Sequence, residues 1–170
     1  MKLKTLCLTD QSFQKSFPDW EKFIKEIIEY INSALKETKF ELKPTIKKWE
    51  TKNLKRTYNS HFLSTEEHRK KYHLVIGFTN KLFLLDHPFC CGMSYKKNII
   101  IAKFFPIKIP LLYKYGLKKL TLHELGHFLE LNDSFFTKIS IMDNFFGTFT
   151  SRFTKKQIEA IKRTPRVSLI

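Results

Sequence analysis

The sequence contains few cysteines, few acidic residues and no long apolar run, and each shortage excludes a class of protein. Its three cysteines include the adjacent Cys90 and Cys91 and form no C-x-x-C pair, which excludes a disulfide framework and a zinc ribbon. No run approaches the about 18 apolar residues that a membrane-spanning helix needs. The first apolar residues are interrupted by Lys4 and lack a cleavage site, so they do not form a signal peptide. We therefore expect a cytoplasmic protein without membrane contact.

The shortage of acid leaves a formal net charge of +15, from 31 Lys and Arg against 16 Asp and Glu. The basic residues are spread along the whole chain, whereas a nucleic-acid groove usually concentrates them on one element. We favour a solvated, lysine-rich surface. Contact with nucleic acid or an acidic partner, through the long-range field of this charge, is the alternative.

Apolar periodicity predicts an α/β (α+β) fold. Alternation over residues 2–8 predicts a first strand, and the nearly continuous apolar run from Tyr72 to Phe78 predicts a central one. Spacings of three and four from Ser16 to Lys36 predict an amphipathic helix. A chain of 170 residues can bury about 70% of its unfolded surface in one core. We expect one monomeric domain over 1–170, with a mixed twisted sheet packed by this N-terminal helix and by a second helix.

Three further segments follow from local signals. Lys39 to Lys43 is expected to be a short strand that Pro44 ends, followed by a basic, irregular loop over 45–56 with Trp49 folded inward. Gly92–Tyr95 and the residues from Asn98 to Phe104 are expected to pair as strands around a turn. A capping box at Thr154 predicts a last helix to about Arg163.

The strongest chemical signal is the pentapeptide His-Glu-Leu-Gly-His at 123–127, within a stretch that is expected to be helical from about Pro110 to Leu131. Residues four apart lie on one helix face, so His123 and His127 can present two imidazoles to one Zn²⁺. Glu124 can reach a metal-bound water and take its proton as general base. The pentapeptide therefore predicts a catalytic zinc site.

The residues that follow resemble the metzincin pattern H-E-x-x-H-x-x-G-x-x-H/D with a later Met-turn. The resemblance implies that Asp133 is the third zinc ligand and that Met142 is the Met-turn residue. It also implies that residues 1–131 form the sheet and the active-site helix, and that residues 132–170 form a C-terminal part with the Met-turn and the last helix. The pattern's glycine is Glu130 here, and positive φ costs Glu of order 1 kcal/mol. Asn132, which tolerates that conformation better, could instead end the helix slightly later.

The order of the segments 55–60, 75–79 and 117–122 is similar to that of the archaemetzincins. This likeness implies a metallopeptidase acting on peptides or proteins. Archaemetzincins carry cysteines that form a second zinc site, but Ser134 and Ser140 occupy those places and no cysteine follows Cys91, which implies one zinc ion. In metzincin-like folds an edge strand before the active-site helix binds the peptide substrate. Here that strand would be formed by Gly92, Met93, Ser94 and Tyr95.

Other classes of function stay open on the sequence. A gluzincin-type peptidase would take its third ligand from a later helix, where Glu159 lies. A DNA-associated protease would use the positive charge to reach its substrate. A non-catalytic protein could hold zinc structurally, with all four coordination positions filled, or bind nucleic acid through its basic surface.

Overall fold

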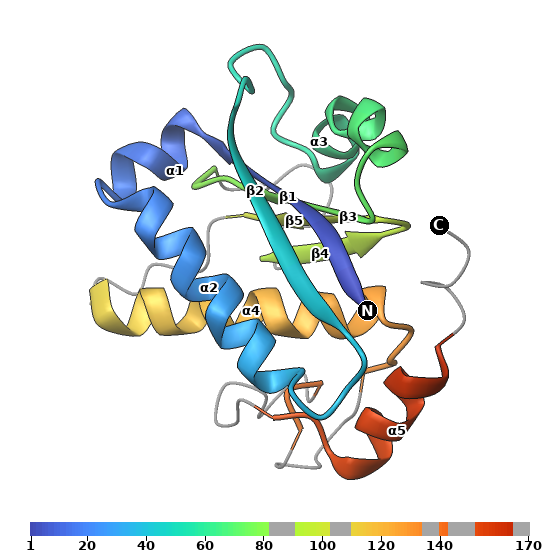
Figure 1. Cartoon of the computed structure of the whole chain (residues 1–170). Helices are drawn as coiled ribbons and strands as arrows, with labels where there is room; N and C mark the ends of the chain where they lie inside the picture. Colours follow the sequence, from blue (N-terminus) through green and yellow to red (C-terminus); the bar gives the residue numbers. More distant parts are fainter. Residues whose placement is uncertain (82–90, 103–109, 134–139, 143–151, 165–170) are drawn as a thin grey trace.

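The computed structural model describes residues 1–81, 91–102, 110–133, 140–142 and 152–164. These residues form a five-stranded sheet with helices on both faces (Figure 1). The elements in chain order are β1 (Lys2–Asp10), α1 (Gln11–Ser16), α2 (Trp20–Ala34), β2 (Glu41–Trp49), α3 (Tyr58–Ser64), the 3-10 helix η1 (Glu66–Lys70), β3 (Leu74–Phe78), β4 (Gly92–Tyr95), β5 (Asn98–Ile101), α4 (Pro110–Phe128) and α5 (Lys155–Arg163).

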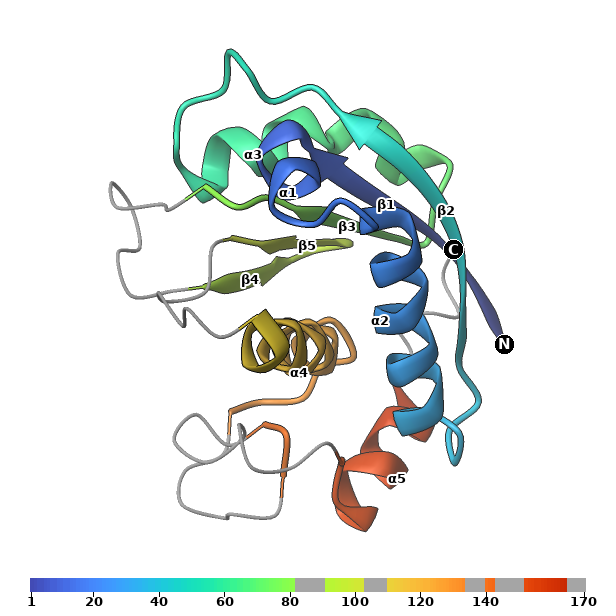
Figure 2. The ribbon, with the colours of Figure 1, turned by 90° about the vertical axis from the view of Figure 1, so that its left-hand side faces the viewer.

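The strand order is β2-β1-β3-β5-β4, and every neighbouring pair is parallel except β4 with β5. Among the described residues β4 therefore pairs on one side only and forms an edge of the sheet. Helices α2 and α4 lie on one side of the sheet and α3 lies on the other (Figure 2). The predicted fold class, a mixed sheet packed by an N-terminal helix and by the helix that carries the His-Glu-Leu-Gly-His pentapeptide, is confirmed.

Side-chain alternation divides the apolar residues into two cores, one on each sheet face. In β1, Leu3 and Cys7 face the helices α2, α4 and α5, whereas Leu6 and Leu8 face α3. The central strand β3 is buried along its whole length, as its continuous apolar run predicted. No helix of the described residues is long and apolar enough to cross a lipid bilayer.

The prediction that Pro44 ends a short strand is wrong. Strand β2 continues through Pro44, which is aligned with Thr5 of β1, to Trp49. An edge strand tolerates proline because alternate N–H groups point away from its partner and need no ladder bond. Trp49 is buried, with 7% of its surface exposed, so it does fold inward, but from the end of a strand rather than from a loop.

Two predicted helices were placed well, and two short helices, α1 and α3, were not predicted. The predicted helix from Ser16 begins later, at Trp20, because a separate helix α1 precedes it. The carboxylate of Asp10 caps α1 by accepting the backbone N–H of Phe13 at 2.9 Å. At the other end of the chain, Thr154 and Gln157 form the predicted capping box of α5.

Candidate metal centre

Helix α4 presents both histidines to one point. The helix is fixed by buried leucines and Phe128, so the direction of its polar face is set by the core. The imidazole rings of His123 and His127 lie 4.8 Å apart between centroids and are nearly perpendicular, and their Nε2 atoms are 3.2 Å apart. This is the arrangement expected for residues one helical turn apart.

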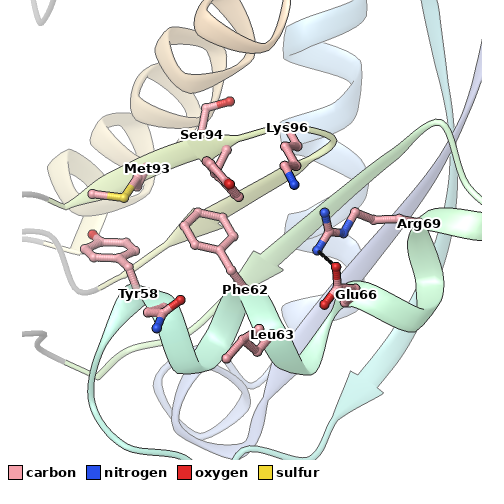
Figure 3. A pocket seen from close by; sticks show the side chains of 10 residues that line it. Tyr58, Phe62, Leu63, Glu66, Arg69, Met93, Ser94 and Lys96 are labelled. Atoms are coloured by element: carbon pink, nitrogen blue, oxygen red, sulfur yellow. Dashed lines mark ion pairs between the residues drawn. The ribbon is translucent and has the colours of Figure 1, made fainter. Parts of the chain in front are cut away.

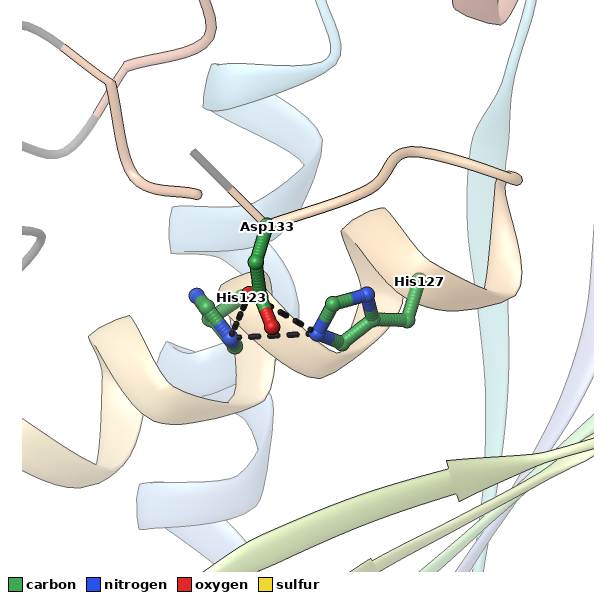
Figure 4. Close-up of side chains that lie close together, drawn as sticks. All are labelled: His123, His127 and Asp133. Carbon is green, nitrogen blue, oxygen red and sulfur yellow. Dashed lines mark hydrogen bonds and ion pairs between the residues drawn. The ribbon is translucent and has the colours of Figure 1, made fainter. Parts of the chain in front are cut away.

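Asp133 brings a carboxylate to the same point (Figure 4). Its Oδ1 atom lies 3.3 Å from Nε2 of His123 and 3.3 Å from Nε2 of His127. Among the described residues these three form the one group of His, Cys, Asp or Glu side chains whose ligand atoms converge as a metal site requires. Asp133 is the residue that the metzincin resemblance implied as third ligand.

The other ring nitrogens fix the tautomers. Nδ1 of His123 lies 2.9 Å from the carbonyl oxygen of Ile141, and Nδ1 of His127 lies 3.0 Å from that of Leu131. A carbonyl oxygen only accepts, so each Nδ1 carries a proton, and in the neutral imidazole the lone pair is then on Nε2. Burial lowers the pKa of His123, which favours the neutral, metal-binding form. Three electron-pair donors therefore face one another without a proton between the imidazoles, an arrangement that a cation would stabilise.

The dimensions of this triangle fit zinc. A tetrahedron with metal–ligand distances of about 2.05 Å has edges of about 3.3 Å. The three edges of the triangle are 3.2, 3.3 and 3.3 Å. Two imidazoles and one carboxylate form a donor set that zinc accepts, and they leave a fourth tetrahedral position for water or substrate.

Asp133 reaches the histidines because the chain reverses at Glu130. The N–H of Leu131 donates to the carbonyl of Gly126 at 2.9 Å, and the N–H of Glu130 donates to that of His127 at 3.0 Å. These two bonds define a Schellman motif, in which the first residue after the helix C-cap has the left-handed backbone conformation. Glu130 takes that position with φ of 65°, and Asn132 has no positive φ. The expectation that Asn132 could end the helix later is therefore wrong.

Met142 lies beneath the pentapeptide. It is fully buried, and its thioether lies where a Cβ on Gly126 would be, so the two side chains could not both be present without a shift. Its backbone N–H donates to Ser140 Oγ at 3.0 Å, and Ser140 Oγ donates to Gln157 of α5 at 2.7 Å. The glycine of the pentapeptide thus provides the space in which Met142 packs.

Glu124 is buried between α4 and β4, with 6% of its surface exposed. A Cβ on Gly92 would lie 2.8 Å from Oε1 of Glu124, so the carboxyl group packs directly against the β4 backbone. Burial, and then repulsion from Asp133, raise the pKa of Glu124 to about 8. A cation held by the neighbouring triangle would oppose this shift by stabilising the carboxylate.

The remaining candidate residues lie at two separate places. Gly92, Met93, Ser94 and Tyr95 form the edge strand β4, which packs beside α4. Glu159 lies on the surface of α5, where its carboxylate pairs with Lys162 at 2.8 Å, and it does not belong to the converging group. Of the two candidates for third ligand, the structure brings only Asp133 to the histidines.

Three groups that hold the site were not foreseen from the sequence. The carbonyls of Ile141 and Leu131 orient the imidazoles, and the side chain of Gln157 anchors the segment that carries Ile141. Backbone carbonyls carry no sequence signal. The sequence predicted the capping box that contains Gln157. The additional hydrogen bond that its side chain accepts from Ser140 depends on tertiary structure.

Comparison with solved structures identifies the fold. Archaemetzincin from Methanopyrus kandleri superposes with a TM-score of 0.70 over 95% of both chains at 17% sequence identity. The chain has an archaemetzincin-like fold. A zinc-dependent peptidase from Methanocorpusculum labreanum superposes with a TM-score of 0.68 at 13% identity, over 92% of this chain and 99% of that one. A chain of a chaperone–substrate complex matches with a TM-score of 0.67 at 12% identity, over 99% of this chain and 34% of that one. No family model and no curated protein matches the sequence.

Glu130→Gly is expected to raise the free energy of unfolding by about 0.5–1 kcal/mol. Removing Cβ relieves the left-handed backbone, and this gain exceeds the entropy that glycine adds to the unfolded chain. Chemical denaturation measures the change. Glu130→Ala is the matched control, because it removes the same side chain but keeps Cβ. An equal gain in both variants would show that the carboxylate, and not the backbone, carries the cost.

Gly126→Ala is expected to destabilise the protein by about 1–3 kcal/mol, because the new methyl group displaces Met142. Zinc affinity should fall in parallel, since Gly126 lies between the two histidines. Gly116→Ala on the same helix is the control, where helix propensity alone predicts a gain of up to about 1 kcal/mol. The double variant Gly126→Ala/Met142→Ala should recover part of the zinc affinity, and calorimetric titration of zinc tests this.

The raised pKa of Glu124 predicts that metal-free protein loses stability as the pH rises. Below about pH 4.5 the carboxyl is protonated in both states and its contribution is fully present. As the pH rises from there through about 8, the unfolded state ionises first and stability falls. Glu124→Gln should remove this fall while leaving the contributions of other groups. Equal pH profiles of unfolding for the two apo-proteins would contradict the prediction.

Proposed function

We propose that the chain is a zinc-dependent metallopeptidase, with one Zn²⁺ held by His123, His127 and Asp133. The observation that carries this proposal is the triangle of three ligand atoms with tetrahedral edge lengths. Both peptidase structures that share the fold are consistent with it. When bound, zinc would lower the pKa of a coordinated water towards neutrality and polarise a substrate carbonyl.

Glu124 is the general base in this proposal. It follows His123 on the helix, and its burial excludes bulk water from the carboxylate. It would take a proton at a carboxylate oxygen from the attacking water and deliver it to the leaving amine. Gly92 contributes by having no side chain where the Glu124 carboxyl lies.

The chain itself would supply the peptide-binding surface. Strand β4 lies at the edge of the sheet beside the helix that carries Glu124. An extended peptide that added to β4 as a further strand would place its scissile bond near the metal site. We propose a peptide or protein substrate for a single monomeric domain, without a requirement for nucleic acid.

The proposal includes one zinc ion per chain, and the ligands of the described residues support this number. Among the described residues no second group of His, Cys, Asp or Glu converges as the first one does. Ser140 forms hydrogen bonds with Gln157 and Met142, so it serves the Met-turn at a place where archaemetzincins carry a cysteine. Ser134 lies outside the described residues.

Glu124→Gln is expected to abolish peptide hydrolysis while zinc stays bound at one equivalent. The amide keeps the size of the side chain and cannot take a proton, so the loss should be at least about 10²-fold in kcat. Metal analysis and cleavage of an unfolded casein-like substrate measure the two quantities. Unchanged activity in this variant would refute the role of Glu124 and favour a non-catalytic zinc protein.

Asp133→Ala is expected to weaken zinc binding by at least about 10²-fold, because one of three protein ligands is lost. Glu159→Ala is the matched control, since that carboxylate lies on the surface of α5. Equilibrium dialysis against a zinc buffer compares the two variants. Full zinc in Asp133→Ala together with loss in Glu159→Ala would establish the gluzincin arrangement instead.

A further inference from the structure

A cavity of about 470 Å³ lies between α3 and strand β4 (Figure 3). Helix α4 lies on the opposite side of the sheet from α3 (Figure 2). The pentapeptide and Asp133 do not contribute to the cavity. Its floor is aromatic and buried at Tyr58 and Phe62, and its rim exposes 60% of Leu63 and 52% of Tyr95. These two rim residues are among the few large apolar side chains that the described residues leave exposed.

The ladder of β4 shows which backbone groups face outward. The N–H of Ala102 donates to the carbonyl of Cys91 at 2.9 Å, so this pair exchanges hydrogen bonds between the strands. Bonded pairs alternate in an antiparallel ladder, which makes Met93 with Ile100 the next bonded pair. Ser94, one residue further, therefore directs its N–H and C=O away from β5. These groups can pair with an added peptide strand.

The same alternation distributes the side chains of such a peptide. Met93 packs in the core on the α3 side, and the Tyr95 ring lies 5.7 Å from that of Phe62 of α3. Gly92 faces the other side, against Glu124. Side chains of aligned residues in neighbouring strands share a sheet face. A peptide residue aligned with Met93 or Tyr95 would therefore point into the cavity, while its neighbours point to the metal side.

The lining indicates what such a side chain would be. The Phe62 and Tyr95 rings lie 5.7 Å apart in the lining, and Lys96 places its ammonium 5.3 Å from the Tyr95 ring centroid. The other charges of the lining, Arg69 and Glu66, neutralise each other in an ion pair of 2.7 Å. An aromatic ring gains more here than an aliphatic chain, because it can stack on the rings and interact with the remaining cation.

We propose that this cavity is a specificity subsite that takes an aromatic side chain of the substrate, aligned with Met93 or Tyr95 of β4. The inference rests on the proposed peptidase function. It adds to that function the selection of an aromatic substrate side chain on the sheet face opposite the metal. Alternate residues of a bound substrate would thus lie on the two faces of the sheet. Hydrolysis would take place on the α4 side, and the aromatic side chain would be selected on the α3 side.

The test compares kcat/KM on peptides in which each position in turn carries Phe or Ala. Wild-type protein should prefer Phe by at least about tenfold at one position. Leu63→Ala should reduce that preference at least about threefold while leaving the rate on the Ala peptide unchanged. Tyr95→Ala should reduce the preference to a similar extent, whatever its effect on the rate with the Ala peptide, because Tyr95 also belongs to the peptide-binding strand. Leu112→Ala, which removes another exposed leucine, from α4 and outside the cavity, should leave the preference intact.

Binding of the same peptides to Glu124→Gln, followed by fluorescence anisotropy, separates two failures. Cleavage without a Phe preference, or a preference that Leu63→Ala and Tyr95→Ala leave unchanged, would overturn the subsite and leave the peptidase proposal standing. Preferential binding of Phe peptides that the wild type never cleaves would overturn the peptidase proposal, whereas absence of both binding and cleavage would overturn both.

Discussion

Two hydrogen bonds from imidazole Nδ1 atoms to backbone carbonyls determine the chemistry of the candidate site. They leave the Nε2 lone pairs of His123 and His127 pointing at one position, 3.2 Å apart. Without them each ring could rotate or change tautomer, and a proton could replace the metal between the rings. Neither carbonyl belongs to the helix that carries the histidines, so the site depends on how the chain continues after that helix.

The candidate site also depends on three positions of special backbone or steric demand. At Glu130 the backbone accepts a conformation that glycine adopts more readily, and this directs Asp133 back to the histidines. At Gly126 and Gly92 the lack of a side chain admits Met142 and Glu124. Met142 thereby packs against the pentapeptide and Glu124 against β4, and each position has its cost in local strain or in lost helix or strand propensity.

Sequence alone predicted the fold class, the central strand and the residues of the triangle. Those predictions rested on fixed spacings: a period of two in strands, a spacing of four for the two histidines, and, for Asp133, the resemblance to the metzincin pattern, in which the third ligand comes six residues after the second histidine. The features that the sequence did not predict depended on tertiary structure. Pro44 could be judged only once β2 was known to be an edge strand, and Glu130 adopts its conformation because the Schellman bonds around it over-determine the turn. The orienting carbonyls were invisible because every residue has one.

The bond from His123 to Ile141 has a consequence for the C-terminal part of the chain. Ile141 is held by its N–H bond to the carbonyl of Arg152 at 2.9 Å, and its neighbour Ser140 is bound to Gln157 of α5. In the proposed zinc site, a helix that contributes no ligand would therefore be thermodynamically linked to the ion: detaching α5 would lower metal affinity, and the bound ion would tighten the attachment of α5. Local opening of α5 and escape of the ion would then be one cooperative event.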